Sequence, residues 1–146
     1  MTHLSRSFHP RRHRFWLALG LMVTLGGCGK DPMGPENRMA LLAFGQCQYE
    51  RALELTDFAI EQGSDKNAHR ALLLQAAIYR DLGQPKAAEA LYPAITTQWA
   101  AMDKGHLSGS KRERDIQLML DIALEERRLR ELPADCAGVD SVFDGH

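Results

Sequence analysis

Apolar residues recur three or four positions apart from Arg38 onward, and no segment alternates apolar and polar residues as a half-buried strand does. This spacing places the apolar residues on one face of a helix. The pattern therefore predicts an all-α fold. Paired helices are expected over residues 38–104, and a loop, a longer helix and a C-terminal tail over residues 105–146.

The longer helix is expected over residues 110–132. Ser110 and Glu113 have the spacing of a capping box at its start, and Pro133 ends it. Its apolar residues form two stripes on roughly opposite faces: Ile116, Met119, Leu120, Ala123 and Leu124 on one, and Leu118, Ile122, Leu129 and Leu132 on the other. Such a helix is expected to be buried between neighbours near its start, while the charges over residues 125–131 indicate a solvated far end.

Two segments of the helical region, 40–63 and 76–99, align with each other at a period of 36 residues. The aligned pairs are Ala40 with Ala76, Cys47 with Gly83, Gln48 with Gln84, and Ala52 with Ala88. A two-helix repeat of this length resembles the tetratricopeptide repeat. Its aromatic and small positions are matched by Tyr49, Ala52 and Ala59 in the first copy, and by Ala76, Tyr79, Gly83 and Ala88 in the second.

The match has departures that bear on the fold. The family's period is about 34 residues, so the two extra residues are expected to lengthen the loop over residues 62–67. Cys47 stands where the family has a turn glycine. Pro93 falls inside a helix of the second copy and is expected to break it near Tyr92. The resemblance implies a short solenoid of about two helical hairpins with a long C-terminal capping helix; an unrelated pair of hairpins is the alternative.

In tetratricopeptide proteins the first helix of each repeat lines a concave groove that binds a peptide or a partner helix. The resemblance implies a partner-binding groove with six residues of this chain: Asn37, Leu41, Phe44, Arg70, Leu73 and Arg80. The two arginines on one face are suited to clamp a carboxylate or an acidic segment. The alternative is a solvated arginine face without a ligand.

The N-terminus has the pattern of a signal peptide. Four arginines, Arg6, Arg11, Arg12 and Arg14, precede the uncharged run FWLALGLMVTL, and no acidic residue occurs before Asp31. A transmembrane helix is the alternative, but the uncharged stretch 15–29 has fifteen residues, whereas spanning a bilayer takes about 20. We therefore expect residues 1–27 to be an export signal.

The four residues LGGC, ending at Cys28, resemble the lipobox of bacterial lipoproteins. The resemblance implies that Cys28 receives acyl chains such as palmitate and becomes the N-terminus after cleavage; a buried free cysteine is the alternative. Gly29 follows, where lipoproteins held at the inner membrane often have Asp, so outer-membrane placement facing the periplasm is favoured. Residues 30–37 contain two prolines and a glycine and show no apolar periodicity. Residues 28–37 are therefore expected to form a flexible tether.

Cleavage changes the charge of the chain. The 18 basic and 19 acidic residues of the whole chain become 14 and 19 when residues 1–27, with four arginines and no acid, are removed, which leaves a net charge of −5. An acidic body argues against a nucleic-acid partner, because nucleic acids select basic surfaces. The remaining 119 residues suit one small domain.

If Cys28 carries lipid, two thiols remain, Cys47 and Cys136. In an oxidising compartment a pair of cysteines is expected to form a disulfide. The alternative is two unpaired thiols that lie too far apart to meet. Neither cysteine belongs to a CxxC motif, so neither a zinc site nor a redox motif is predicted.

No catalytic residues are predicted. His69, His106 and His146 are scattered without a second ligand at helical spacing and are expected at the surface, so neither a metal nor a cofactor is expected. The sequence also has no glycine-rich phosphate loop and no nucleophile elbow. Trp99 and Met102 are assigned to the core, with an exposed Trp99 that anchors a partner as the alternative.

These observations favour a membrane-tethered interaction module without enzymatic activity. By analogy with other helical-repeat lipoproteins, it is expected to be accessory to an envelope machine such as a secretion, pilus or conjugation system. The alternative is a structural lipoprotein of envelope maintenance that partners peptidoglycan enzymes. An enzyme acting on a small substrate is the third possibility.

Overall fold

The computed structural model describes residues 33–139. The expected signal peptide, Cys28, most of the expected tether and residues 140–146 lie outside this range. The described residues form six helices and no strand. They are α1 (Pro35–Gly45), α2 (Tyr49–Gln62), α3 (Asp65–Asp81), α4 (Pro85–Ala90), α5 (Tyr92–Ala101) and α6 (Gly109–Leu129). The prediction of an all-α fold is confirmed.

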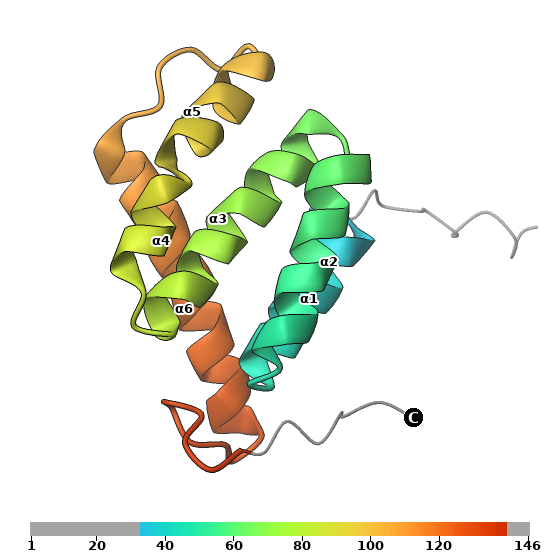
Figure 1. Ribbon diagram of the computed structural model, residues 1–146, viewed down its shortest axis with the longest axis vertical. Coiled ribbons are helices and arrows are strands. Elements are labelled where there is room, and N and C mark those ends of the chain that lie inside the picture. The colour runs from blue at the N-terminus through green and yellow to red at the C-terminus, as the bar shows by residue number, and fades with distance from the viewer. Residues whose placement is uncertain (1–32, 140–146) are drawn as a thin grey trace, which may run out of the picture. The chain divides into compact units, whose positions relative to one another are not determined.

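The helices form two consecutive hairpins followed by the long C-terminal helix (Figure 1). In the first hairpin α1 packs against α2, and in the second α3 packs against α4 and α5. Contacts between α2 and α3 join the hairpins. The long helix α6 packs against α1 and α3, which are the first helices of the two hairpins. The chain is a short helical solenoid closed by α6.

The 36-residue period corresponds to two hairpin turns of the same geometry. Cys47 and Gly83, which align in the sequence, both have a left-handed backbone, with φ of 64° and 69°. In each turn the following amide N–H reaches back five residues to a carbonyl, as in a Schellman motif. These bonds run from Gln48 N to Ala43 O at 2.9 Å and from Gln84 N to Tyr79 O at 2.8 Å.

Pro93 separates α4 from α5. Helix α4 ends at Ala90 and α5 begins at Tyr92, with the proline in its first turn. A proline in that place loses no helical hydrogen bond, whereas inside a continuous helix it removes one and clashes with the preceding turn. The predicted break near Tyr92 is confirmed.

Three expected boundaries were wrong. Helix α1 begins at Pro35, so residues 35–37 of the expected tether are helical. Only Gly63 and Ser64 separate α2 from α3, so the two extra residues of the period do not form a longer loop. The N-cap of helix α6 lies two residues earlier than the capping box predicted: the side chain of Ser108, rather than Ser110, accepts a hydrogen bond from Lys111 N.

Small residues lie where the helices pack most closely. The four alanines of the aligned pairs, Ala40, Ala52, Ala76 and Ala88, are fully buried. Gly45 allows α1 and α6 to approach closely, since a Cβ atom at this position would lie only 2.6 Å from Cβ of Glu126. Larger side chains fill the space between them, including Phe44, Leu74, Ile78, Ile95 and Ile116.

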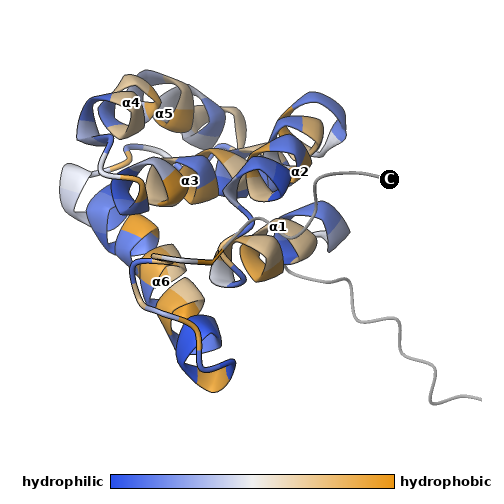
Figure 2. Cartoon of the chain, turned by 60° about the horizontal axis from the view of Figure 1, so that its bottom comes forward, coloured by the Kyte–Doolittle hydropathy of each residue, from blue (hydrophilic) through white to orange (hydrophobic). Residues whose placement is uncertain are grey.

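Helix α6 is buried along one face only. Ile116, Met119 and Ala123 lie in the core, whereas Leu118 and Ile122 are 53% and 41% exposed. Figure 2 shows hydrophobic positions along α6 where it extends from the hairpins. The prediction that this helix is buried on both faces near its start is therefore wrong. The prediction that its far end is solvated is wrong at Arg127, which is 1% exposed.

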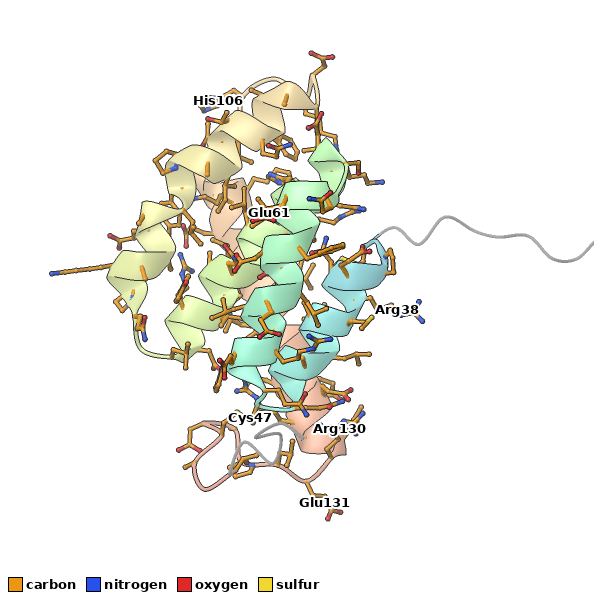
Figure 3. All side chains as sticks on the ribbon, turned by 45° about the vertical axis from the view of Figure 1, so that its right-hand side comes forward. Arg38, Cys47, Glu61, His106, Arg130 and Glu131 are labelled. Atoms are coloured by element: carbon orange, nitrogen blue, oxygen red, sulfur yellow. A yellow bond between two sulfur atoms is a disulfide. The ribbon has the colours of Figure 1, made fainter. Side chains whose placement is uncertain are left out.

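The first hairpin is bonded to the segment that follows α6. The Sγ atoms of Cys47 and Cys136 form a disulfide, with the Cα atoms 5.6 Å apart. Figure 3 shows Cys47 at the same end of the described domain as Arg130 and Glu131, and His106 at the other end. The bond therefore ties the C-terminal segment to the turn between α1 and α2.

Candidate functional site

The expected concave groove is not open. Helix α6 packs against α1 and α3 and occupies the face that their side chains would present to a partner. Asn37 and Phe44 are fully buried and Leu73 is 3% exposed. Leu41 is half-buried and packs against the same core. The prediction that Asn37 and Phe44 line an open partner-binding groove was wrong, because both side chains are buried inside the domain.

The two arginines do not form one clamp. Arg70 and Arg80 are ten positions apart on α3, or about 15 Å along the helix axis at 1.5 Å per residue. Arg80 already has partners, since its Nη2 donates to the hydroxyl of Tyr92 and to the carboxylate of Glu113. Partial burial acts to raise the pKa of Glu113, but the hydrogen bonds from Arg80 and Tyr92 outweigh it and hold this pKa below its ordinary value.

Arg70 instead lines a pocket of about 220 Å³ between three parts of the fold. One wall is α3, the second is the end of α5 with the loop that follows it, and the third is α6. Lys66, His69, Arg70 and Leu73 share one face of α3 because they are three or four positions apart. The same spacing brings Lys111, Asp115, Leu118 and Met119 onto one face of α6.

The basic pocket, as we call it, carries more positive than negative charge. Four cationic side chains line it, Lys66, Arg70, Lys104 and Lys111. Asp115 is the one carboxylate among its lining residues, and it accepts a hydrogen bond from Lys111 Nζ at 2.7 Å. The lining therefore has a formal charge of +3, in a chain whose expected mature charge is −5. Such a local excess of one sign attracts an anionic group.

Trp99 forms the aromatic part of the basic pocket. The Nζ atoms of Lys104 and Lys111 lie 5.0 and 5.1 Å from the centroid of its ring, within the range of cation–π attraction. The ring of His69 lies 5.3 Å from the same indole, centroid to centroid. Trp99 is half-buried, so it belongs neither wholly to the core nor to an isolated exposed site.

Two residues that line the basic pocket each have a buried donor without a hydrogen-bond acceptor among the described residues. The donors are Nη1 of Arg70 and the indole Nε1 of Trp99. A buried polar group that forms no hydrogen bond costs about 1–3 kcal/mol. Both atoms lie beneath the surface of the pocket wall, so the charged and partly exposed side chains of the lining, rather than these two donors, face a ligand.

His69 was expected at the surface, but only 5% of it is exposed. Its Nδ1 lies 3.3 Å from the carbonyl oxygen of Ile95, a geometry in which Nδ1 donates. Burial lowers the pKa of His69 from its ordinary value; the carbonyl and Asp115 oppose this shift, and Lys104 and Lys111 add to it. The imidazole is thus favoured in its neutral form.

Neither a metal site nor a membrane-spanning helix is found in the described range. Within residues 33–139, no three His, Cys, Asp or Glu side chains are grouped so that they could hold a metal ion. The helices of the same range are too short or too polar to cross a bilayer. Comparison with protein-family models, with curated proteins and with solved structures finds no match.

Proposed function

We propose that this chain is a lipid-anchored protein of the cell envelope that binds a partner polypeptide through the basic pocket. The location rests on the sequence: the pattern of residues 1–27 is typical of an export signal, and the lipobox resemblance implies an acylated Cys28. Outer-membrane attachment with the helical domain facing the periplasm fits Gly29 after the cysteine.

The observation that carries the binding proposal is the group of cations around Trp99. Lys66 and Lys104 are exposed, Arg70 is partly exposed, and the Nζ atoms of Lys104 and Lys111 lie over the ring of Trp99. A polypeptide with an acidic group supplies the opposite charge. A small pocket offers few contacts to a partner. Anchorage of both molecules to the envelope would raise their effective concentration and so favour binding.

The proposed class of partner is a subunit of an envelope machine, such as a secretion, pilus or conjugation apparatus. A peptidoglycan synthase or hydrolase is the partner expected for the alternative role in envelope maintenance. Both roles use the same binding activity, so the identity of the captured protein distinguishes them.

Capture from detergent-solubilised envelopes tests the proposal. The double variant Lys66→Glu, Lys104→Glu reverses two exposed charges of the basic pocket without changing the core. We expect it to retain less than a tenth of the partner held by the unchanged protein. Lys86→Glu, at an exposed lysine of α4 that is not in the pocket lining, is the matched control and should capture normally. Equal capture by all three proteins would refute binding through the pocket.

A further inference from the structure

We infer that the basic pocket binds the C-terminal residue of a polypeptide, with its carboxylate at Arg70 and an apolar side chain against the opposite wall. This inference rests on the proposed function and specifies the chemistry that the site recognises. A carboxylate bonded to an apolar group is the shared chemistry of chain ends and of small organic acids, and the experiment below separates these two sources.

The carboxylate position follows from the cations on α3. Arg70 lines the pocket with a partly exposed side chain. A guanidinium offers two parallel N–H donors that match the two oxygens of a carboxylate. Lys66 lies one turn earlier on the same face of α3 and adds a second cation beside Arg70. Asp115 does not compete for this position, because Lys111 Nζ holds its Oδ2 at 2.7 Å.

The position of the apolar group follows from the other walls. Leu73, Met102, Leu118 and Met119 line the pocket together with the face of Trp99. Leu118 is 53% exposed in the described domain, so an apolar side chain placed there would cover surface that is otherwise in water. Burial of a Leu-sized or Val-sized side chain contributes about 1.5–3 kcal/mol.

The volume limits the ligand to about one residue. Pockets for drug-sized ligands have about 300–1,000 Å³, whereas this one has about 220 Å³. A partner helix or a long extended segment does not fit inside it. One terminal residue fits, and it carries both the carboxylate and the side chain that the walls accept.

Trp99 provides a direct measurement of binding. The chain has two tryptophans, Trp16 in the leader and Trp99 in the pocket. In the Trp16→Phe protein, purified in detergent with or without residues 1–27, the fluorescence therefore comes from Trp99 alone. The probes are acetyl-Ala-Ala-Leu with a free carboxylate, the same peptide with a C-terminal amide, acetyl-leucine, and inorganic phosphate.

We expect the peptide acid to change the fluorescence in a saturable way, and the amide and phosphate to bind at least tenfold more weakly. Acetyl-leucine, which has no residues outside the pocket, should bind more weakly than the tripeptide. Arg70→Gln should reduce binding of the peptide acid at least tenfold, and Lys66→Gln, at an exposed side chain, should also weaken it. Arg114→Gln, an exposed arginine of α6 outside the pocket lining, is the control and should not.

Each contrary result overturns a defined part of the inference. Equal binding of acid and amide would exclude the carboxylate, and equal binding of phosphate would make the site a general anion site. Acetyl-leucine binding as tightly as the tripeptide would assign the site to small acids. If no peptide binds although capture still depends on Lys66 and Lys104, the inference fails and the proposed function stands. If the peptide acid binds but no envelope protein is captured, the proposed function fails.

Discussion

The guanidinium of Arg127, on α6, donates two hydrogen bonds to the carboxylate of Asp81, at the end of α3. The distances are 2.6 Å from Nη2 to Oδ2 and 3.3 Å from Nη1 to Oδ1. Arg127 is 1% exposed and also donates to the carbonyl oxygens of Phe44 and Ala134. One buried side chain thus joins α6 to both hairpins and to the C-terminal segment.

The same carboxylate of Asp81 accepts a hydrogen bond from the hydroxyl of Tyr49 at 2.7 Å. Burial and then this bond raise the pKa of Tyr49 to about 12. The cluster of Arg127, Asp81 and Tyr49 lies beside the turn that carries Cys47. It therefore holds the end of the domain to which the disulfide is also attached.

We predict that Arg127→Ala lowers the free energy of unfolding by about 3–5 kcal/mol, because it leaves the carboxylate of Asp81 without its buried partner. Urea unfolding followed by circular dichroism measures the change. Arg128→Ala is the matched control, because Arg128 is its neighbour in the sequence and pairs with Glu125 on the surface. Exposed pairs contribute about 0–1 kcal/mol. Equal losses in the two variants would contradict a special role for Arg127.

The aligned turns yield a prediction for Cys47. Its left-handed backbone is one that a residue with a side chain adopts at a cost of about 1–2 kcal/mol, whereas Gly83 adopts it freely. Cys47→Gly and Cys47→Ser both remove the disulfide, but the glycine variant should be more stable by about 1 kcal/mol. Thermal unfolding of the two purified variants measures the difference. A more stable serine variant would show that the turn is not strained at this position.

The disulfide itself should connect Cys47 to Cys136 in the protein isolated from cells. A bond that closes a loop of sequence separation 89 contributes up to about 4–5 kcal/mol in the chain-entropy model. Peptide mapping without reduction should find the linked pair, and reduction should lower the midpoint of thermal unfolding. Alkylation of both cysteines as free thiols would show that the protein in cells lacks this disulfide.

The helical class, the hairpin turns and the break at Pro93 could be predicted because each depends on residues close together in the chain. Alanine spacing, a turn position and a proline act locally. The path of α6 could not be predicted in this way. Periodicity showed two apolar stripes over residues 116–132, but it did not show which stripe packs against α1 and α3 and which faces solvent.

The candidate site was missed for the same reason. Lys66 and Arg70 are one turn apart and could have been noticed as a basic pair on a helix face. Lys104 and Lys111 lie more than thirty positions later, and no local signal joins them to α3. Leu73, which the resemblance assigned to a groove, contributes to the basic pocket as an apolar wall. Of the six expected groove residues, Arg70 and Leu73 are the two that line this pocket.

The buried His69 predicts a dependence of stability on pH. Its pKa is lowered in the folded protein, so the unfolded chain binds the proton more readily. The stabilising contribution is therefore complete above the ordinary value of 6.5 and is lost as the pH falls through the lowered folded-state value. His69→Asn, which keeps a side-chain N–H donor but does not titrate, should show a weaker decrease in unfolding free energy between about pH 7.5 and pH 5.5.

His106→Asn is the control for this measurement, because His106 is exposed in the loop before α6 (Figure 3). Its variant should keep the pH dependence of the unchanged protein. A dependence that is the same in His69→Asn and in the unchanged protein would show that His69 is not the group responsible.

Mass spectrometry of the protein from fractionated cells tests the anchored location most directly. We predict that the membrane fraction contains a chain that begins at Cys28 and carries acyl chains, and that Cys28→Ala moves the protein out of that fraction and abolishes the added mass. An intact, unacylated chain with residues 1–27 still present, recovered from the cytosol, would show that the protein is not lipid-anchored.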